Sequence, residues 1–350
     1  MRKLVAVLAT LSVLALSAGT AAAAPNDPYW NLQWGPVQIN APQAWTTSTG
    51  AGATIAVVDS GVDLDHPDLA GKIVGGATFF GCPTQPNGCG NGDWQSGGGT
   101  PEPHGTHVAG IAAASTNNGI GIAGVAPDAK ILAVRALDAN GGSFEEIAAG
   151  VRWAADHGAN VINLSLGALP GVQALVITGL MSDVQSAIAY ARSKGVVVVA
   201  AAGNETAPLC DTPGSDDGAL CVVATDKREL HAAYSNFGVK YPLDVVAAPG
   251  GAAVVSCQDD VISTVPPDAA PGSCEQSEGT PGYDFYAGTS MATPQVAGVA
   301  ALLAAQGRTD DQIVSVLERT ARTPGVGLRG TYTPAYGYGI VDAAAAVASP

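Results

Sequence analysis

Apolar runs of strand length, separated by helical patterns, are the feature that most restricts the fold of this chain. The runs TIAVV, ILAV, VINLSL and VVVVAAA lie at 54–58, 131–134, 161–166 and 196–202. Runs with so few polar residues are typical of parallel strands that are buried on both faces. Helical patterns alternate with them at 104–112, 143–157 and 182–194. The alternation predicts an α/β fold with a mostly parallel central sheet.

Cap and turn residues set the limits of these elements. Three pairs have the spacing of a helix capping box: Ser143 with Glu146, Ser182 with Gln185, and Thr309 with Gln312. The glycine-rich string at 119–124 matches a dinucleotide-binding fingerprint, but a helix precedes it and a strand follows, the reverse of the required order. We interpret it as a tight loop. Shorter strands are expected at 221–224 and 243–247, and an irregular arm over the core at 25–53.

Composition and charge limit the class of protein. The chain has 350 residues, of which 47% are hydrophobic and 13% charged, as expected of a globular protein with a large core. Its formal net charge is -15, and neither sign forms a long block. Because affinity for nucleic acid comes mainly from basic side chains on phosphate groups, nucleic acid is not an expected partner.

The first 24 residues have the pattern of a secretory signal peptide. A basic start at Arg2 and Lys3 is followed by an apolar run at 4–18 and by small residues up to Ala24. A membrane anchor is the alternative, but the run is short for a span. We therefore expect cleavage near Ala24, secretion of residues 25–350 as one domain, and no membrane contact after removal of the signal.

The six cysteines form three close pairs in loop-like sequence. The pairs are Cys82 with Cys89, Cys210 with Cys221, and Cys257 with Cys274. An exported chain would be oxidised, which predicts three local disulfides. Zinc is the competing use, but no pair has the C-x-x-C spacing of a zinc motif and no histidine lies beside them.

Four polar residues stand at the ends of predicted elements. Asp59 and Asn204 each follow an apolar run, His104 begins a small-residue helix, and Ser290 is expected to cap another helix. The carboxyl ends of parallel strands are where open α/β sheets place their sites. A structural interpretation is also open, because aspartate starts turns and serine caps helices.

The order of these residues along the chain restricts the possible chemistry. All five histidines precede Ser290, which excludes a hydrolase with the order serine, acid, histidine. The orders Asp-His-Ser and His-Asp-Ser both remain. At the start of a helix, N–H groups and the helix dipole favour a hydroxyl that attacks a carbonyl, provided that a base is near.

The histidine pair 104 and 107 also has spacing that suggests a metal site. The zinc-protease pattern, however, has glutamate beside the first histidine and a four-residue spacing. Here Gly105 occupies that position. We expect His107 to point into the core.

Four segments carry a resemblance to a known family. They are AVVDSGVD at 56–63, HGTHVAGI at 104–111, VVAAAGN at 198–204 and GTSMATPQVAG at 288–298. In these segments the chain resembles the subtilisin-like serine proteases, and its arm at 25–45 is most similar to the thermitase branch. The similarity extends from about Pro25 to about Ala345. It implies a three-layer fold with helices on both faces of the sheet.

The resemblance also implies roles for individual residues. Asp59, His104 and Ser290 match the catalytic triad, and Asn204 matches the residue that completes the oxyanion hole with the Ser290 N–H. The walls of the primary specificity pocket match two backbone strips, which are Ser165, Leu166 and Gly167, and Ala201, Ala202 and Gly203. Because neither strip carries a charge, large apolar or aromatic side chains are expected before the cut bond.

A calcium site is implied by the family and has a physical basis in the sequence. The glycines of the loop at 115–122 allow carbonyl groups to turn toward one centre, and oxygen ligands suit Ca²⁺. By position, the ligands would be Asp27, Asp68, Asn118 and the carbonyl groups of Ser115, Ile120 and Ile122.

The chain departs from the family pattern in three places. Cys82, Cys89 and extra glycines replace an aspartate-rich loop that holds a second calcium ion, so that site is not expected here. The segment 168–181 is longer and more apolar than the usual loop. The signal peptide runs directly into mature-like sequence, and we expect no separate pro-domain.

The expected function is that of a secreted serine endopeptidase that hydrolyses peptide bonds through an acyl-enzyme. Its expected partners are protein or peptide substrates, its cofactor Ca²⁺, and its state monomeric. The alternative is a non-catalytic binding protein on the same fold. Such proteins usually lack a triad residue or the oxyanion asparagine, whereas all four are present here.

Overall fold

The computed structural model describes residues 24–167, 182–254 and 256–350. Apart from Ala24, the predicted signal peptide lies outside the described residues, and so does the apolar segment 168–181. No described helix is long and apolar enough to cross a membrane.

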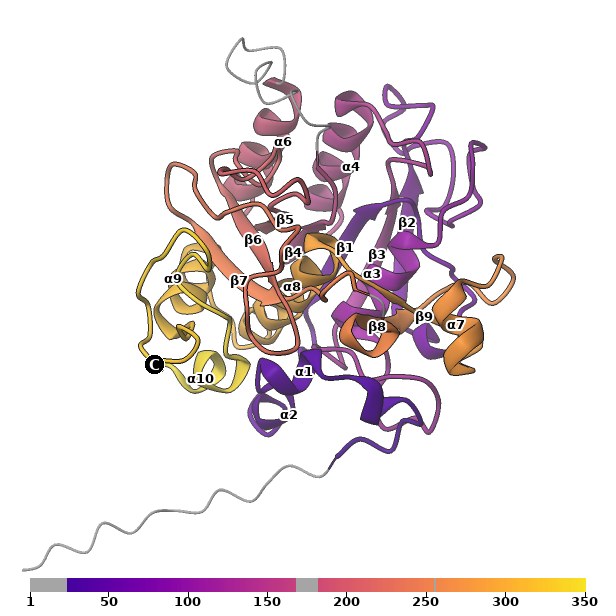
Figure 1. The fold of residues 1–350 in the computed structure, drawn as a ribbon. Helices are drawn as coiled ribbons and strands as arrows, with labels where there is room; N and C mark the ends of the chain where they lie inside the picture. The colour runs from indigo at the N-terminus through magenta and orange to yellow at the C-terminus, as the bar shows by residue number, and fades with distance from the viewer. Residues whose placement is uncertain (1–23, 168–181, 255) are drawn as a thin grey trace, which may run out of the picture.

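A seven-stranded sheet forms the centre of the molecule (Figure 1). Its strand order is β2-β3-β1-β4-β5-β6-β7, and every neighbouring pair is parallel. The strands are β1 (Thr54–Asp59), β2 (Ile73–Thr78), β3 (Lys130–Arg135), β4 (Val161–Leu164), β5 (Val197–Ala201), β6 (Ala219–Thr225) and β7 (Val245–Pro249). The predicted parallel α/β sheet is therefore confirmed.

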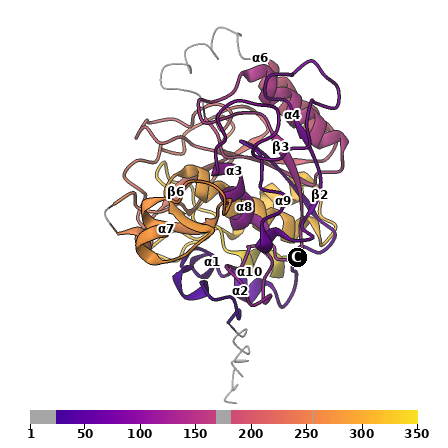
Figure 2. The same ribbon diagram turned by 90° about the vertical axis from the view of Figure 1, so that its right-hand side faces the viewer.

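Helices cover both faces of this sheet. On one face, α3 (His104–Ala113) and α8 (Thr289–Ala304) belong to the larger core; on the other, α4 (Phe144–Asp156) and α6 (Ser182–Ser193) belong to the smaller one. Figure 2 shows the same arrangement from the side, with α4 and α6 away from α3 and α8. The predicted three-layer fold is confirmed.

The apolar strand sequences follow from this double burial. In β1, Ile55 and Val57 pack into the core with α3 and α8, whereas Ala56 and Val58 pack into the core with α4 and α6. Successive side chains of a strand point to opposite faces, so a strand between two cores is apolar at every position.

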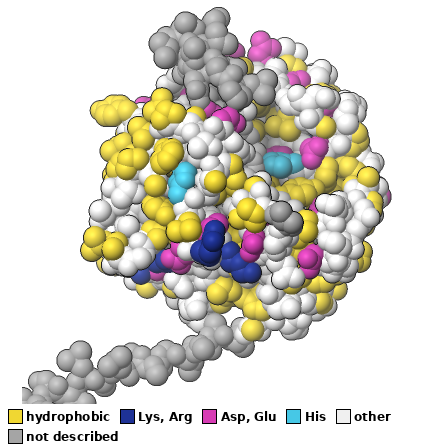
Figure 3. All heavy atoms as spheres, in the orientation of Figure 1, with side chains coloured by type: hydrophobic (Ala, Val, Ile, Leu, Met, Phe, Trp, Pro, Cys, Tyr) yellow, Lys and Arg dark blue, Asp and Glu magenta, His cyan; other side chains and the backbone are white. Residues whose placement is uncertain are grey.

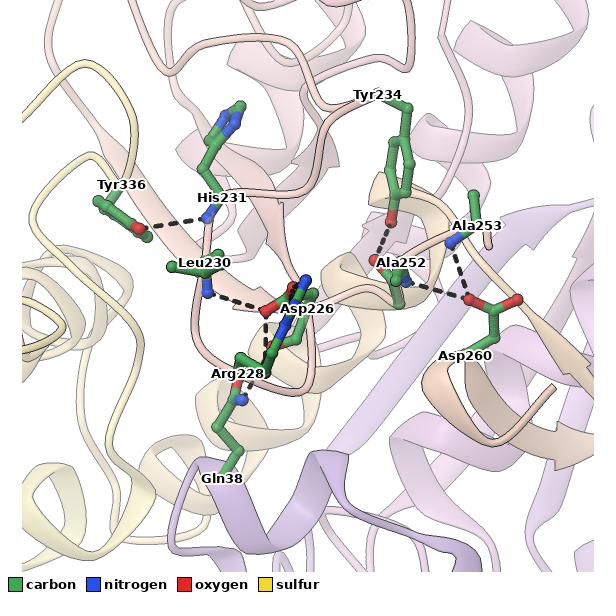
Figure 4. A network of polar contacts seen from close by, with 11 residues as sticks. Gln38, Asp226, Arg228, Leu230, His231, Tyr234, Ala252, Ala253, Asp260 and Tyr336 are labelled. Carbon is green, nitrogen blue, oxygen red and sulfur yellow. Dashed lines mark hydrogen bonds and ion pairs between the residues drawn. The ribbon is translucent and has the colours of Figure 1, made fainter. Parts of the chain in front are cut away.

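The arm at the N-terminus contains more regular structure than we expected. It forms three short helices, η1 (Trp30–Leu32), α1 (Gly35–Gln38) and α2 (Ala41–Ala44). Polar contacts attach it to the core: Trp45 Nε1 donates to Val125 O (2.9 Å), and Gln38 Nε2 donates to Asp226 O (3.0 Å). Figure 4 shows Gln38 below the loop that carries Asp226. Prolines among the tryptophans lie in the first turn of α1 and α2, which is why the pattern appeared irregular.

Several elements have no clear pattern in the sequence. Strand β2 contains Gly75 and Gly76, and a Cβ at Gly76 would overlap the backbone oxygen of Asn91 and lie 2.6 Å from that of Ala133. An antiparallel hairpin of β8 (Val261–Thr264) and β9 (Tyr283–Tyr286) packs on α3, beside α7 (Ser273–Glu278). The last helices are α9 (Asp310–Thr320) and α10 (Ala343–Ala348). Contacts with distant parts of the chain, rather than a local sequence pattern, determine the positions of β2 and of the β8–β9 hairpin.

The three predicted disulfides are present as paired in the sequence analysis. Each closes a local loop. On the face shown in Figure 3, hydrophobic and acidic side chains are interspersed, and the lysine and arginine side chains gather in one small cluster. No large basic surface is visible on that face, in keeping with the acidic net charge.

Glu146 combines two structural roles at the start of α4. Its carboxylate accepts from Ser143 N (2.6 Å) to complete the predicted capping box, and from Gly81 N (2.6 Å), directly before the Cys82–Cys89 loop. We predict that Glu146→Ala lowers the free energy of unfolding by about 1–2 kcal/mol, since it removes a cap and the acceptor of a second N–H. Urea denaturation measures this. Glu145→Ala, at the exposed neighbouring position, is the control, and an equal loss in both variants would contradict the assignment.

Candidate active site

Asp59 and His104 meet at the carboxyl edge of the sheet. Asp59 is the last residue of β1 and is fully buried, and His104 is the first residue of α3. His104 Nδ1 lies 2.8 Å from Asp59 Oδ1, and 24% of the histidine side chain is exposed. Because Nδ1 faces the carboxylate, Nε2 is the ring nitrogen that can exchange a proton with a bound molecule.

Small residues hold this pair in place. Ser60 Oγ accepts from Gly105 N (2.9 Å) and donates to Glu102 O (2.9 Å), which fixes the start of α3 against the end of β1. A Cβ at Gly105 would overlap Gly61 O and lie 3.2 Å from Asp59 Oδ1. Glycine is therefore required next to His104 for the helix to approach the carboxylate so closely.

The electrostatic surroundings of His104 favour its protonated form. Burial by itself lowers the pKa of the imidazole, but the charge of Asp59, the hydrogen bond to Asp59 and the charge of Glu102 together raise the pKa above its ordinary value of 6.5. Glu102 had no place in the sequence analysis.

Ser290 lies at the second position of α8 and does not cap the helix as we predicted. The residue before the helix is Gly288, in an extended conformation, and the N–H of Thr289 is accepted by Asn204 Oδ1 (2.9 Å) from another segment. A side chain distant in sequence thus performs the capping role, which no local pattern reveals. Ser290 Oγ donates to Ser165 O (3.1 Å), and no described hydrogen bond joins it to His104.

Asn204 is oriented by Thr289, a residue that the sequence analysis missed. Its Oδ1 accepts from both Thr289 N and Thr289 Oγ1 (3.0 Å), which turns Nδ2 the other way. If Gly288 carried a Cβ atom, that atom would lie 3.6 Å from both Asn204 Nδ2 and Ser290 N. Among the described hydrogen bonds, none uses either of these donors. Both donors lie close to one point, as the donors of an oxyanion site must.

The two predicted pocket strips follow neighbouring strands of the sheet, β4 and β5. Ser165, Leu166 and Gly167 follow β4, while Ala201, Ala202 and Gly203 end β5 and continue beyond it. Ser165 Oγ donates to Ser290 O (2.8 Å), so the first strip is attached to α8. A neighbouring cavity of about 270 Å³ is lined on one side by Leu166 and Gly167, and elsewhere by Phe144, Ile147 and Val184.

An acidic pair lies against both strips and was not expected there. Asp211, which is 1% exposed, lies next to Gly167 and Gly203, and Glu205 lies beside it. Burial first, and then the hydrogen bond to Glu205 and its charge, raise the pKa of Asp211 to about 7. No motif marks Asp211 in the sequence, although it follows Cys210 directly. The strips themselves carry no charge, as predicted, but their surroundings do.

The loop that carries Asp211 is held by a buried lysine. Lys240 is 7% exposed, and its Nζ donates to Asp216 O (2.8 Å) and Ala219 O (2.5 Å). This ammonium group therefore links the end of the loop to the segment before β7.

The predicted calcium ligands are also gathered in one region. Asp68 is fully buried and Asp27 is 4% exposed. Asp68 accepts from Asn118 Nδ2 (2.7 Å) and Ile122 N (2.9 Å), and Asp27 from Asn118 N (3.1 Å). Burial raises the pKa of Asp68 to about 6, opposed by its hydrogen bonds and assisted by the charge of Asp27.

The remaining predicted ligands in this region are backbone carbonyl groups. Among the described residues, no hydrogen bond ends on the carbonyl oxygens of Ser115, Ile120 or Ile122. The described residues also contain no group of three or more His, Cys, Asp or Glu side chains suited to a metal. Two carboxylates, an amide and free carbonyls nevertheless match the hard oxygen donors that Ca²⁺ prefers.

His107 has the inward position that we predicted. It is fully buried, its Nε2 lies 3.1 Å from Asp284 O, and its ring stacks on Tyr286 at 4.3 Å. Burial, which dominates, lowers its pKa to about 3, so the ring is neutral. It supports the packing of the β8–β9 hairpin on α3 and takes no part in the candidate site.

Comparison with known proteins identifies the class of molecule. Residues 50–339 match the Subtilase family. The chain is 45% identical to the thermitase of Thermoactinomyces vulgaris over 299 residues, which is 85% of this chain and 91% of that protein. It is 42% identical to a thermophilic serine proteinase of Bacillus sp. (strain AK1), covering 86% of this chain and 65% of that protein.

A solved structure agrees with this result. A protease from Pseudoalteromonas arctica PAMC 21717 superposes with a TM-score of 0.75 at 34% identity, covering 93% of this chain and 99% of that one. The chain belongs to the subtilase family of serine proteases. It is a serine-type endopeptidase.

The environment of His104 predicts the pH dependence of activity. A histidine that acts as a general base must be neutral, so we expect kcat/KM to fall as the pH drops through the pKa of His104 in the free enzyme. Because that pKa lies above 6.5, the midpoint of the acid limb should also lie above 6.5. Glu102→Gln removes one of the charges that raise it, and should move the midpoint to lower pH. Rates on a peptide amide over a pH series measure this; Glu145→Gln, on the exposed surface of α4, should leave the midpoint unchanged.

Proposed function

We propose that Asp59, His104 and Ser290 form the catalytic triad of this endopeptidase and that Asn204 completes its oxyanion hole. The observation that carries the proposal is the 2.8 Å contact between His104 Nδ1 and a fully buried Asp59, at the same sheet edge as Ser290 and Asn204. A buried carboxylate that orients an imidazole is the arrangement that makes histidine a base toward a hydroxyl.

The reaction begins when Ser290 exchanges its hydrogen bond to Ser165 for one to His104 Nε2. His104 takes the hydroxyl proton as Oγ attacks the carbonyl carbon of the peptide, and Asp59 stabilises the imidazolium that forms. Asn204 Nδ2 and Ser290 N–H donate to the developing oxyanion. His104 then gives the proton to the leaving amine, and water hydrolyses the acyl-enzyme by the same steps.

The substrate binds as an extended chain along the two strips. Backbone groups of Ser165 to Gly167 and of Ala201 to Gly203 provide the hydrogen-bonding edges, and an added strand is the usual way to use such edges. The cavity beside Leu166 and Gly167 accepts an apolar side chain of the same peptide. The enzyme acts as a monomer on protein or peptide substrates.

Calcium stabilises the attachment of the arm. Asp27, Asp68, Asn118 and the carbonyl groups of Ser115, Ile120 and Ile122 would hold the ion, and the Asn118 amide can present its oxygen to it by rotation. A divalent cation there would offset the repulsion between the two buried carboxylates. Its role is structural and it takes no part in the cleavage reaction.

The enzyme acts outside the cell. Residues 1–24 direct export and are removed, and residues 25–350 form the secreted peptidase. The basic start, apolar run and small-residue site at the N-terminus support this proposal, as do three disulfides, which persist in oxidising compartments.

Substitutions in the candidate centre test the mechanism. Ser290→Ala should lower kcat by several orders of magnitude with little change in melting temperature, because triad residues act as a unit. Asn204→Ala should lower kcat about 100- to 1000-fold, since it removes one donor to the oxyanion. Initial rates on casein and on a peptide amide measure both effects.

A serine-directed phosphonate provides the control. Wild type and Asn204→Ala should be labelled at Ser290, and Ser290→Ala should not. Near-normal turnover by Ser290→Ala would rule out this triad, and a wild type that neither cleaves nor labels would favour the non-catalytic alternative.

Removal of calcium should destabilise the protein. A ligand that binds only the folded state adds about 2.7 kcal/mol at 100 times its dissociation constant, so chelation should lower the melting temperature and hasten self-digestion in the arm. Asp68→Asn should have a low melting temperature that no longer responds to calcium. Asp65→Asn, an exposed position nearby, should retain the response. An unchanged melting temperature after chelation, with no calcium bound to the purified protein, would remove the site.

A further inference from the structure

We infer that Asp211 is a specificity-determining residue of the substrate pocket and that, with Glu205, it selects lysine or arginine before the cut bond. The inference rests on the proposed function, because it assumes that the two strips form the pocket for that side chain. It replaces our expectation of an apolar preference, which rested on the strips alone.

The position of Asp211 relates it to both strips. Its N–H donates to Ala202 O (2.8 Å), which attaches its backbone to the second strip. A Cβ at Gly203 would overlap Asp211 Oδ2, and a Cβ at Gly167 would lie 3.9 Å from the same oxygen. The carboxyl group therefore lies close to both strips, and at both points the facing residue is a glycine.

The same strips lead directly to the reacting groups. Ser165 O accepts the hydrogen bond of Ser290 Oγ, and Asn204 follows Gly203 in the chain. A substrate side chain that enters between the strips next to Ser290 thus extends toward Asp211. The other acidic residue that we assign to the centre is Asp59, and its carboxylate contacts His104 Nδ1.

Glu205 adds a second carboxyl group nearer to solvent. Its Oε2 accepts from Asn236 Nδ2 (3.0 Å) and would lie 2.7 Å from a Cβ at Gly203. The amide of Asn236 also donates to Ala202 O (2.9 Å), so it holds Glu205 against the strip. Glu205 is exposed whereas Asp211 is buried. An entering side chain would meet Glu205 before Asp211.

Lysine and arginine have the chemistry that fits this arrangement. Their long apolar stems can pack along glycine backbone, and their charge lies at the far end. Because Asp211 is buried behind the glycines, only a long side chain reaches it. An apolar side chain in the same space offers the two carboxyl groups neither a positive charge nor a hydrogen-bond donor.

The titration of the pair adds a second signature. Burial, the hydrogen bond to Glu205 and the Glu205 charge raise the pKa of Asp211 to about 7, opposed by the neutral Asn236 amide. Glu205 is the titratable group described beside it. A cation in the pocket favours the ionised form. The preference for a basic over an apolar side chain should therefore increase as the pH rises through about 7.

The test uses the mature enzyme and two peptide amides that differ only in arginine or phenylalanine before the cut bond. The quantity measured is the ratio of their kcat/KM values, in which the ionisation of His104 cancels. Wild type should favour arginine. Asp211→Asn should reduce the ratio about 10- to 100-fold, the usual range for a lost charge-assisted hydrogen bond, and abolish its pH dependence. Glu205→Gln should reduce it less.

Asp217→Asn is the matched control, because it removes an exposed charge of the same loop and should leave the ratio unchanged. Phenylalanine cleavage and melting temperature check that each variant is folded. If Asp211→Asn does not fold, Glu205→Gln decides, and an unchanged ratio overturns the inference.

A wild type that cleaves only after phenylalanine, or an Asp211→Asn ratio equal to that of wild type, also overturns the inference and leaves the proposed function intact. Loss of cleavage after both residues, without phosphonate labelling of wild type, overturns the proposed function instead.

Discussion

Burial of both faces of the parallel sheet is the constraint on which the rest of the structure depends. Helices cover each face, so the strands carry apolar side chains and polar groups collect where strands end. Strands β1, β4 and β5 are neighbours in the sheet, although β2, α3, β3 and α4 lie between β1 and β4 in the chain. Their adjacency places Asp59, Ser165 and Asn204 along one edge, and α8 brings Ser290 to the same edge.

The parts of the molecule that could be predicted from the sequence are those with a local signal. Apolar strands, the capping boxes of α4 and α9, the cysteine pairs and the motif residues Asp59 and His104 all have one. Strand β2, the β8–β9 hairpin and the cap of α8 depend on contacts between distant segments. For the same reason Thr289 and Asp211 were missed: each acts on a neighbour in space that is far away in the chain.

Three of the buried carboxylates belong to the sites described above, and the neighbours of each define its use. Asp59 faces a histidine and keeps its ring oriented. Asp68 faces a second carboxylate, an amide and free carbonyl groups, which suits a metal ion. Asp211 faces another acid beside glycine backbone, which suits a mobile cation from a substrate. The same side chain thus serves three purposes, because burial makes its neighbours decisive.

The buried ammonium group of Lys240 holds the loop that carries Asp211 without a bound metal ion. It occupies the carbonyl oxygens of Asp216 and Ala219 with a positive charge that is covalently part of the chain. A tethered cation cannot be diluted, exchanged or extracted, whereas a bound ion can. The loop that carries Asp211 therefore keeps its shape in metal-free solution, and chelation that loosens the N-terminal arm should leave substrate selection intact.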